Sequence, residues 1–291
     1  MPDVYSVITE ADDAVIERVA MAMETSAADP QHEAMVADYL SRLDPSDRSR
    51  VVEIGCGTGA IARIITRLIE VGEYVGTDPS EPLLERARRF APGGRLRFER
   101  ADGADLPFDD ASFDAAIIHR VLSHAPDPTA VVTEAVRVLR PGGVLAICDG
   151  DYATTTVALS ATDPLQCCVA AFTPAFVNDA WVVRRLSRLA TEAGVERLQV
   201  RSYGFVQVHD ADYMLSIIER GAAQLVTTGT IGPQLAAALT GEAQRRVDNG
   251  IFFGHVAYGS LTATKPRMQP RSEAGKPQRA RRESNPRPSD P

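Results

Sequence analysis

Short apolar runs alternate with amphipathic stretches along the first half of the chain. Val51, Val52 and Ile54 form a run typical of a buried strand. Residues 60–69 carry apolar side chains at i, i+3 and i+4, which predicts a helix. The same alternation predicts further helices over residues 80–91 and 128–140, and further strands within residues 73–80, 95–108, 112–128 and 139–151. Such alternation predicts a parallel sheet with helices on both faces.

The flanking segments are predicted to be mainly helical. Residues 12–43 indicate two helices with a break near Asp29 and Pro30. After residue 150 the alternation pauses, and the pattern then predicts a helix over 181–193 ending at Gly194, a strand over 198–208, helices within 211–249 broken at 229–233, and a last strand within 251–266. A long helical insertion before the last strand is expected to form a lid above the carboxyl edge of the sheet.

Charge is distributed unevenly along the 291 residues, whose formal net charge is −8. Residues 265–291 carry a net charge of +5, are rich in proline and contain few large apolar side chains, so we predict a disordered basic tail. A basic tail can touch RNA or acidic lipid, but a solvated extension is the favoured interpretation. The remaining body has a net charge of −13, which argues against a nucleic-acid or anionic-membrane partner.

The cellular setting is predicted from what the sequence lacks. No apolar run approaches the ~20 residues needed to span a membrane, and the first residues do not resemble a signal peptide. The four cysteines fit neither a zinc site nor a disulfide framework: Cys56, Cys148, Cys167 and Cys168. We therefore expect no membrane association and a reducing, cytoplasmic compartment.

A glycine-rich turn follows the first strand. Gly55, Gly57 and Gly59 have the spacing G-x-G-x-G, and such a turn lets a ligand approach the backbone at the carboxyl end of a strand. The dinucleotide fingerprint G-x-G-x-x-G would place its third glycine at Ala60, where alanine is also tolerated. Glu53 at the strand end would repel a pyrophosphate but suit an ammonium or sulfonium group. The spacing and Glu53 therefore oppose a nicotinamide cofactor.

Four motifs in this order carry a family resemblance: EIGCGTG at the first strand, Asp78 at the end of the second, ADGADLPF after the third, and LRPGGVL before the fifth. Together they resemble the class I S-adenosylmethionine-dependent methyltransferases, in particular the small-molecule branch that includes ubiquinone/menaquinone-type enzymes. The resemblance is strong over residues 48–150 and looser to about residue 264.

The resemblance implies an α/β fold, a doubly wound, seven-stranded, mostly parallel sheet of the Rossmann-like methyltransferase type with helical lid insertions. Residues 1–45 would form an N-terminal helical cap. Residues 46–264 would form the methyltransferase domain, with insertions at about 151–180 and 210–250. Residues 265–291 would be the tail.

The resemblance also implies how S-adenosylmethionine, and its product S-adenosylhomocysteine, would be bound. At the methionine end, the backbone of Gly55, Cys56 and Gly57 would line the ligand, Glu53 would lie near the amino-acid group, and the His119 carbonyl would lie near the ammonium.

The adenosine end would be held by residues that follow the second and third strands. Asp78 would accept hydrogen bonds from the ribose hydroxyls, an interaction that an acidic residue at this offset from the glycines can make. Pro79 would lie against the adenine. Asp102, with the backbone at Gly103, would bind the adenine amino group.

The acceptor side offers weaker candidates. His124 and His119 are possible general bases, because histidine titrates near neutral pH, although an orienting role is as common for such a residue. Asp149 and Asp151 are expected just beyond the fifth strand, where they could bind a substrate amine. Carboxylates in a loop more often serve as caps, so no metal is predicted. Tyr152 and Tyr5 are further candidates for the substrate pocket.

Three functions stay open at this point. The favoured one is methyl transfer to an O, C or N atom of a small-molecule metabolite by a monomer or homodimer. The second is an S-adenosylmethionine-binding protein without turnover, in a regulatory or interaction role. The third is a nicotinamide-dependent oxidoreductase. The chain has no N-P-P-Y-like tetrapeptide after the fourth strand, which disfavours enzymes that methylate bases or glutamine amides.

Overall fold

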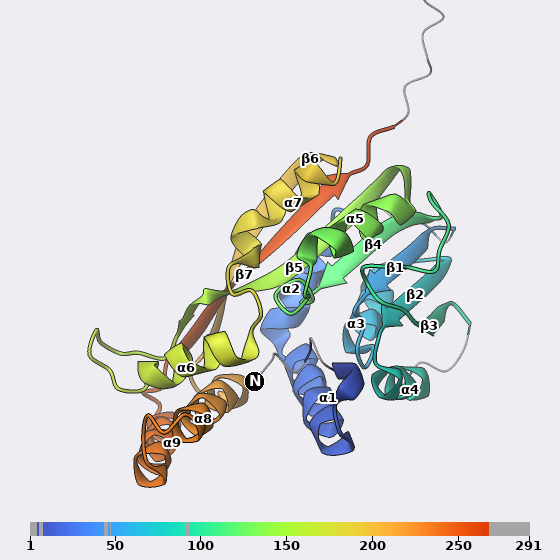
Figure 1. Ribbon diagram of the computed structural model, residues 1–291. Coiled ribbons are helices and arrows are strands. Elements are labelled where there is room, and N and C mark those ends of the chain that lie inside the picture. The colour runs from blue at the N-terminus through green and yellow to red at the C-terminus, as the bar shows by residue number, and fades with distance from the viewer. Residues whose placement is uncertain (1–4, 6–7, 44–45, 47, 91–93, 268–291) are drawn as a thin grey trace, which may run out of the picture.

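The computed structural model describes residues 5, 8–43, 46, 48–90 and 94–267 (Figure 1). Its centre is a seven-stranded sheet with the order β3-β2-β1-β4-β5-β7-β6. The strands are β1 (Arg50–Ile54), β2 (Glu73–Asp78), β3 (Leu96–Arg100), β4 (Phe113–His119), β5 (Leu139–Thr156), β6 (Glu196–Gln207) and β7 (Gly254–Thr264). The first five are parallel, and β7 runs antiparallel to both β5 and β6. This order confirms the predicted doubly wound, mostly parallel fold.

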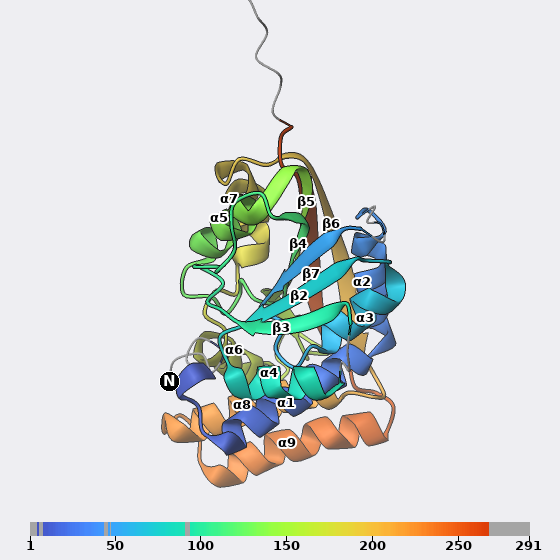
Figure 2. The same cartoon turned by 90° about the vertical axis from the view of Figure 1, so that its right-hand side faces the viewer.

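Helices cover both faces of the sheet (Figure 2). α2 (Pro30–Leu40) and α3 (Ala60–Leu68) lie on one face, and α5 (Pro128–Val138) and α7 (Leu186–Glu192) lie on the other. α4 (Glu81–Phe90) packs against β2 and β3.

Alternating side chains of the strands supply the two hydrophobic cores. Val51 and Ile117 belong to one buried cluster, whereas their chain neighbours Val52 and Ile118 belong to the other. Successive strand residues point to opposite faces, so an almost continuous apolar run is what a strand buried on both sides requires.

The remaining helices gather at the carboxyl ends of the parallel strands. α1 (Asp13–Ala28) lies there with α8 (Asp212–Thr227) and α9 (Pro233–Asp248), as Figure 2 shows. α6 (Gln166–Phe176) packs on α8, and α8 packs on α9. The predicted break before α2 is confirmed, because Asp29 accepts a hydrogen bond from the Gln31 backbone N–H at 2.8 Å and Pro30 begins the helix.

Local details depart from the sequence-based expectation in three places. The predicted helix over 181–193 is a short 3₁₀ turn (Val182–Arg185) followed by α7, although Gly194 adopts the expected positive φ of 88°. The last strand begins at Gly254 rather than near residue 251. β5 continues to Thr156, because its second half pairs with β7.

The start of the predicted tail is held against the domain. Lys265 Nζ donates hydrogen bonds to the backbone carbonyls of Val136, Arg137 and Leu139, which lie at the end of α5. This contact places a cation at the negative end of the helix dipole. Residues 268–291, which make up nearly all of the predicted tail, lie outside the described residues. Across the described ranges, every helix is too short or too polar to cross a bilayer.

Candidate active site

The glycine turn between β1 and α3 has a backbone that other residues rarely adopt. Gly55, Gly57 and Gly59 have φ values of 74°, 52° and 70°. A Cβ on Gly55 would overlap the side chain of Val121, and one on Gly57 would lie 2.5 Å from Met23 Sδ. The spacing G-x-G-x-G therefore reflects both a left-handed backbone and a lack of room for side chains.

Asp78 closes this turn from the end of β2. Its Oδ2 accepts a hydrogen bond from the Gly57 backbone N–H at 2.8 Å, and its Oδ1 accepts one from the Ser80 N–H at 2.9 Å. Burial raises the pKa of Asp78 to about 6, against the opposite effect of these two N–H groups. The Ser80 hydroxyl is buried without a hydrogen bond among the described residues.

A cavity of about 330 Å³, called here the outer cavity, lies beside Asp78 at the carboxyl ends of β1 and β2. Five of the residues predicted to bind the cofactor line it: Gly55, Asp78, Pro79, Asp102 and Gly103. Asp102 Oδ1 accepts a hydrogen bond from the Ala104 N–H at 2.9 Å, which fixes its side chain in the turn after β3. The structure thus brings the predicted adenosine residues to one hollow.

A second, smaller cavity of about 100 Å³, the inner cavity, lies against the glycine turn. Glu53, Cys56 and His119 line it, as predicted for the methionine end. Five residues line both cavities, which places the two hollows next to each other: Tyr5, Met23, Gly55, Arg120 and His124.

Glu53 is a fully buried acid at the wall of the inner cavity. Its Oε2 accepts a hydrogen bond from the Tyr74 hydroxyl at 2.9 Å. Burial raises the pKa of Glu53 to about 7; the Tyr74 hydrogen bond lowers this pKa, and the nearby Asp78 raises it further. A cation placed in the cavity would favour the ionised form of this carboxyl group.

The two histidines predicted as bases differ in environment. His119 is buried at the end of β4; its Nδ1 lies 3.0 Å from the Tyr39 hydroxyl, and its Nε2 has no hydrogen-bond partner among the described residues. Burial, Arg120 and His32 lower the pKa of His119 well below its ordinary value, so its ring is neutral. His124 lines both cavities and packs against Tyr5, with ring centroids 4.4 Å apart.

The predicted acceptor-side acids are placed differently from the expectation. Asp149 and Asp151 lie within β5, paired with Gly259 and Ala257 of β7, because the strand does not end before them. Asp149 is fully buried and accepts hydrogen bonds from the backbone N–H groups of Ser123 and Gly150, at 3.1 Å and 2.8 Å. These contacts support a structural role for Asp149.

Asp151 Oδ2 forms an ion pair with Arg184 Nε at 2.9 Å, and Asp151 is outside the lining of both cavities. Tyr152 is also outside both linings, although its ring centroid lies 6.1 Å from that of His124. Of the four predicted pocket residues, only Tyr5 lines the cavities. Over the described ranges, no three or more His, Cys, Asp or Glu residues form a group that could hold a metal ion.

The sequence-based reasoning missed several residues of the inner cavity. Arg120 directly follows β4 and has a φ of 58°, which is unusual for a residue with a side chain. Arg220 and Tyr213 reach the cavity from α8, and His32 reaches it from α2. Only the positive φ of Arg120 is a local feature. The role of the other three depends on how distant helices pack.

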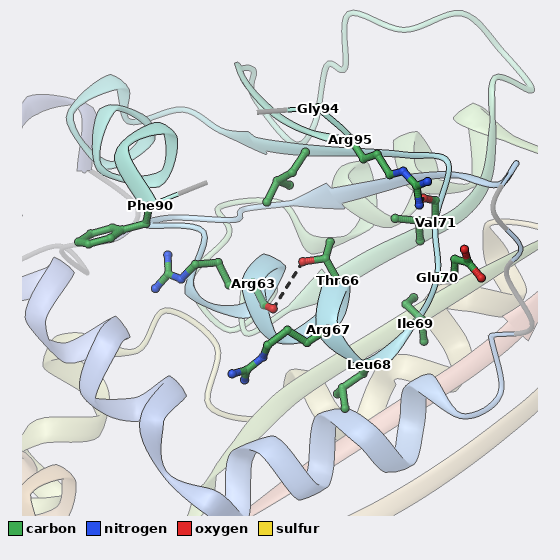
Figure 3. Close-up of a pocket in the computed structure, with 11 residues that line it drawn as sticks. Arg63, Thr66, Arg67, Leu68, Ile69, Glu70, Val71, Phe90, Gly94 and Arg95 are labelled. Atoms are coloured by element: carbon green, nitrogen blue, oxygen red, sulfur yellow. Dashed lines mark hydrogen bonds between the residues drawn. The ribbon is translucent and has the colours of Figure 1, made fainter. Parts of the chain in front are cut away.

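A larger hollow of about 710 Å³ lies elsewhere (Figure 3). It is lined by the end of α3, the end of α4, and the residues at the amino ends of β2 and β3, among them Arg63, Arg67 and Arg95. Open α/β sheets bind their ligands at the carboxyl ends of the strands. The smaller paired cavities beside Asp78 and Glu53 are therefore the better candidate despite their lower volume.

Part of the chain is similar to a known protein family. Residues 52–147 match the model of a family described as "Methyltransferase domain". This segment is similar to a methyltransferase domain. The matched part runs from β1 into β5 and includes Asp78, Asp102 and His124.

Three relatives are similar to parts of this chain in sequence. The chain is 30% identical to an uncharacterised 37.1 kDa transposon protein of Streptomyces fradiae, over 75% of this chain and 63% of that protein. It is 36% identical to an O-methyltransferase of Pyrenophora dematioidea, over 40% of this chain and 45% of the relative. It is 37% identical to the 2-phytyl-1,4-naphtoquinone methyltransferase of Synechococcus elongatus, over 38% and 48%. The chain thus spans about half to two thirds of the length of these relatives.

Solved structures share the fold of this chain. The YcgJ protein of Bacillus subtilis aligns with a TM-score of 0.57 and 19% identity, covering 81% of this chain and all of that chain. A phosphoethanolamine N-methyltransferase of Haemonchus contortus, solved with S-adenosylhomocysteine, aligns with a TM-score of 0.50 and 16% identity, over 80% of this chain and 53% of that one. At these identities the likeness concerns the fold alone.

Proposed function

We propose that this protein transfers a methyl group from S-adenosylmethionine to an O, C or N atom of a small-molecule acceptor. One observation carries the proposal. The outer cavity beside Asp78 opens beside the inner cavity under the lid helices, and the glycine turn forms part of both walls. The adenosine and methionine parts of a methyl donor need two adjoining hollows of this kind. The acceptor must then reach the methionine end, because methyl transfer is an in-line displacement that depends on orientation.

The outer cavity fits the adenosine part of the donor. The buried Asp78 carboxylate can accept hydrogen bonds from two ribose hydroxyls, since each of its oxygens has a further lone pair beyond the one used by Gly57 or Ser80. Pro79 supplies an apolar surface for the adenine, and Asp102 an acceptor for its amino group. A Cβ on Gly103 would lie 2.8 Å from Ile54 Cγ2, so glycine keeps this wall open.

The methionine part fits the wall formed by the glycine turn. Glu53 lies where a cationic ammonium or sulfonium would favour its ionised form. The backbone of Gly55, Cys56 and Gly57, together with the His119 carbonyl, provides the remaining polar groups in this proposal. Bound S-adenosylmethionine supplies a methyl group on a sulfonium, which leaves as a neutral thioether and needs no proton.

The protein's own contribution is then to orient the acceptor, exclude water and, for a protonated acceptor, take up a proton. Of the two histidines, His124 is the better candidate base. It lines both cavities, whereas burial holds the His119 ring neutral and makes it a weak base. The adjoining Tyr5 packs on His124 and can orient its ring.

Several finer features belong to the same proposal. The match to a naphthoquinone methyltransferase supports the ubiquinone/menaquinone-type branch. Residues 1–45 would act as a helical cap and residues 46–264 as the catalytic domain, with lids at about 151–180 and 210–250. Residues of α1 and α8 line the inner cavity and α6 packs on α8, which supports this division. A cytoplasmic setting is supported by the cysteine pattern of the sequence, and the protein would be a monomer or a homodimer.

The test is calorimetric titration with S-adenosylhomocysteine and NADH, followed by a methyl-transfer assay against a panel of small hydroxyl, amine and quinone acceptors. We expect S-adenosylhomocysteine to bind, NADH to fail, and at least one acceptor to be methylated. Binding without turnover on any acceptor would favour the regulatory alternative. No binding of S-adenosylhomocysteine would overturn the proposal.

A further inference from the structure

Arg120 is a half-buried cation that lines both cavities. Its backbone N–H donates to the Cys148 carbonyl at 2.7 Å, and its guanidinium Nη1 donates to the Ser26 hydroxyl. Among the described residues, no carboxylate forms an ion pair with it. A half-buried charge that lines a cavity and has no counter-ion points to a ligand of opposite charge.

Two aromatic rings flank the Arg120 guanidinium. Its carbon lies 5.8 Å from the centroid of Tyr213 on α8 and 5.7 Å from that of Tyr258 on β7. Such rings stabilise a cation but do not neutralise it. Tyr213 also lines the inner cavity, whereas neither tyrosine lines the outer cavity.

A second guanidinium lines the same inner cavity. Arg220 on α8 stacks over Phe172 and Phe176 of α6, at 4.8 Å and 4.2 Å from their ring centroids. Within the described ranges it has neither an ion pair nor a hydrogen-bond acceptor. Stacking orients its planar fork of N–H donors, which is the arrangement that recognises a planar oxyanion.

Other polar atoms of the inner cavity also lack partners. His32 Nε2, His119 Nε2 and the Thr58 hydroxyl are buried and, among the described residues, make no hydrogen bond, although all three residues line this cavity. Buried polar atoms are normally satisfied, so a cluster of unsatisfied ones indicates that a polar ligand completes them.

We propose that Arg120 and Arg220 bind a carboxylate on the methyl acceptor, so that the substrate is a small carboxylic acid. This inference rests on the proposed function and specifies its substrate class. Two guanidinium groups that line the inner cavity without an ion-pair partner among the described residues match a planar anion better than a neutral group. The acceptor's reacting atom would then lie beside His124, which lines the same cavity.

The test uses the full chain loaded with S-adenosylhomocysteine. Thermal unfolding midpoints are measured against increasing acetate, its neutral isostere acetamide, and inorganic phosphate, at constant ionic strength set with chloride. The variants are Arg120→Gln and Arg220→Gln, and the control is Arg245→Gln on α9, whose side chain is 63% exposed. Binding of S-adenosylhomocysteine to each variant is measured separately by calorimetry.

We expect acetate to stabilise the loaded wild type more than acetamide does, and each cavity variant to need on the order of tenfold more acetate for the same effect. The control Arg245→Gln should match the wild type in both its acetate response and its S-adenosylhomocysteine affinity. Equal responses to acetate and acetamide, with S-adenosylhomocysteine still bound, would overturn the inference alone. A stronger stabilisation by phosphate than by acetate would overturn the carboxylate assignment and favour a phosphate monoester as the substrate.

Two outcomes distinguish a failure of this inference from a failure of the proposed function. If Arg120→Gln loses S-adenosylhomocysteine binding while Arg220→Gln keeps the acetate response, Arg120 serves the donor's own carboxylate and the inference is wrong. If the wild type does not bind S-adenosylhomocysteine, the proposed function itself fails. Should Arg120→Gln not fold, Arg220→Gln decides the question, because its site on α8 is partly exposed.

Discussion

Asp78 Oδ2 accepts the Gly57 backbone N–H at 2.8 Å, which joins the end of β2 to the glycine turn that follows β1. The same carboxylate forms part of the wall of the outer cavity. One acidic side chain therefore both fixes the turn and presents an anion to a ligand. Replacing it tests the cofactor site directly.

Asp78→Asn is expected to weaken S-adenosylhomocysteine binding by about 1.5–3 kcal/mol, because it removes charge-assisted hydrogen bonds to the ribose. Calorimetric titration measures the change. The matched control is Asp248→Asn at the exposed end of α9, which should bind like the wild type. An unaltered affinity in Asp78→Asn would mean that the ribose lies elsewhere.

The buried acids predict how the stability of the ligand-free protein depends on pH. Burial raises the pKa of Glu53 to about 7 and that of Asp78 to about 6. Unfolded carboxyl groups ionise near pH 4, so between about pH 4 and 7 the folded state holds more protons than the unfolded state. These two groups therefore make the free energy of unfolding fall as pH rises through that window.

Glu53→Gln removes the Glu53 part of this dependence. We expect the ligand-free variant to exceed the wild type in free energy of unfolding by up to a few kcal/mol at pH 8, with the difference vanishing toward pH 4. Urea unfolding at a series of pH values measures it. Glu85→Gln, at a 60% exposed side chain of α4, serves as the control and should follow the wild-type profile. A constant offset at every pH would contradict the raised pKa of Glu53.

Donor binding should show the opposite pH dependence. A bound sulfonium and ammonium favour the ionised forms of Glu53 and Asp78, so S-adenosylmethionine should bind more tightly at pH 8 than at pH 6 and release protons on binding. Calorimetry in two buffers of different ionisation enthalpy counts those protons. Proton uptake, or no proton exchange at pH 6.5, would argue against a cation beside Glu53.

The glycine turn allows backbone strain to be separated from steric overlap. Gly55 and Gly194 have φ values of 74° and 88°, but a Cβ on Gly55 would overlap Val121, whereas one on Gly194 would meet nothing within 4 Å. Gly194→Ala should cost only the backbone term, roughly 1–2 kcal/mol of unfolding free energy. Gly55→Ala should cost roughly 1–3 kcal/mol more, because it also overfills the turn.

The double variant Gly55→Ala with Val121→Ala provides the check on this assignment. It should recover the steric part of the loss relative to Val121→Ala alone, while the backbone part stays. Chemical denaturation of the ligand-free variants gives the four free energies needed for the cycle. Equal costs at Gly55 and Gly194 would show that the turn has room for a side chain.

Much of this architecture could be predicted because it depends on local patterns. The order of strands and helices followed from alternating apolar runs, and the break at Asp29 and Pro30 followed from the fixed φ of proline and a capping side chain. Asp78 and Asp102 were predicted from their position at strand ends, and both line the outer cavity.

The acceptor side was harder to predict because its residues meet only through long-range packing. Asp149 and Asp151 were expected in a loop, but pairing with β7 extends β5 past them and turns both into strand residues. Arg120 packs against Tyr213 and Tyr258, which belong to α8 and β7 and lie much later in the chain. Such contacts join residues that are far apart in the sequence, so no local pattern predicts them.

His124→Gln separates a catalytic role from a structural one. If His124 is the general base, turnover should fall by about 10²–10⁴-fold while S-adenosylhomocysteine affinity stays near that of the wild type, because the imidazole acts on the acceptor and not on the donor. His119→Gln offers the comparison. Its ring is hydrogen-bonded to the Tyr39 hydroxyl at 3.0 Å within the core, so its loss should reduce stability as well as turnover.

The measurements are kcat with an accepted substrate, its dependence on pH, and calorimetric affinity for S-adenosylhomocysteine. A base that titrates should give the wild type a pH-dependent limb in kcat that His124→Gln lacks. Parallel losses of turnover and affinity in His124→Gln, with an unchanged pH profile, would instead make His124 a residue that packs on Tyr5 and shapes the cavity wall.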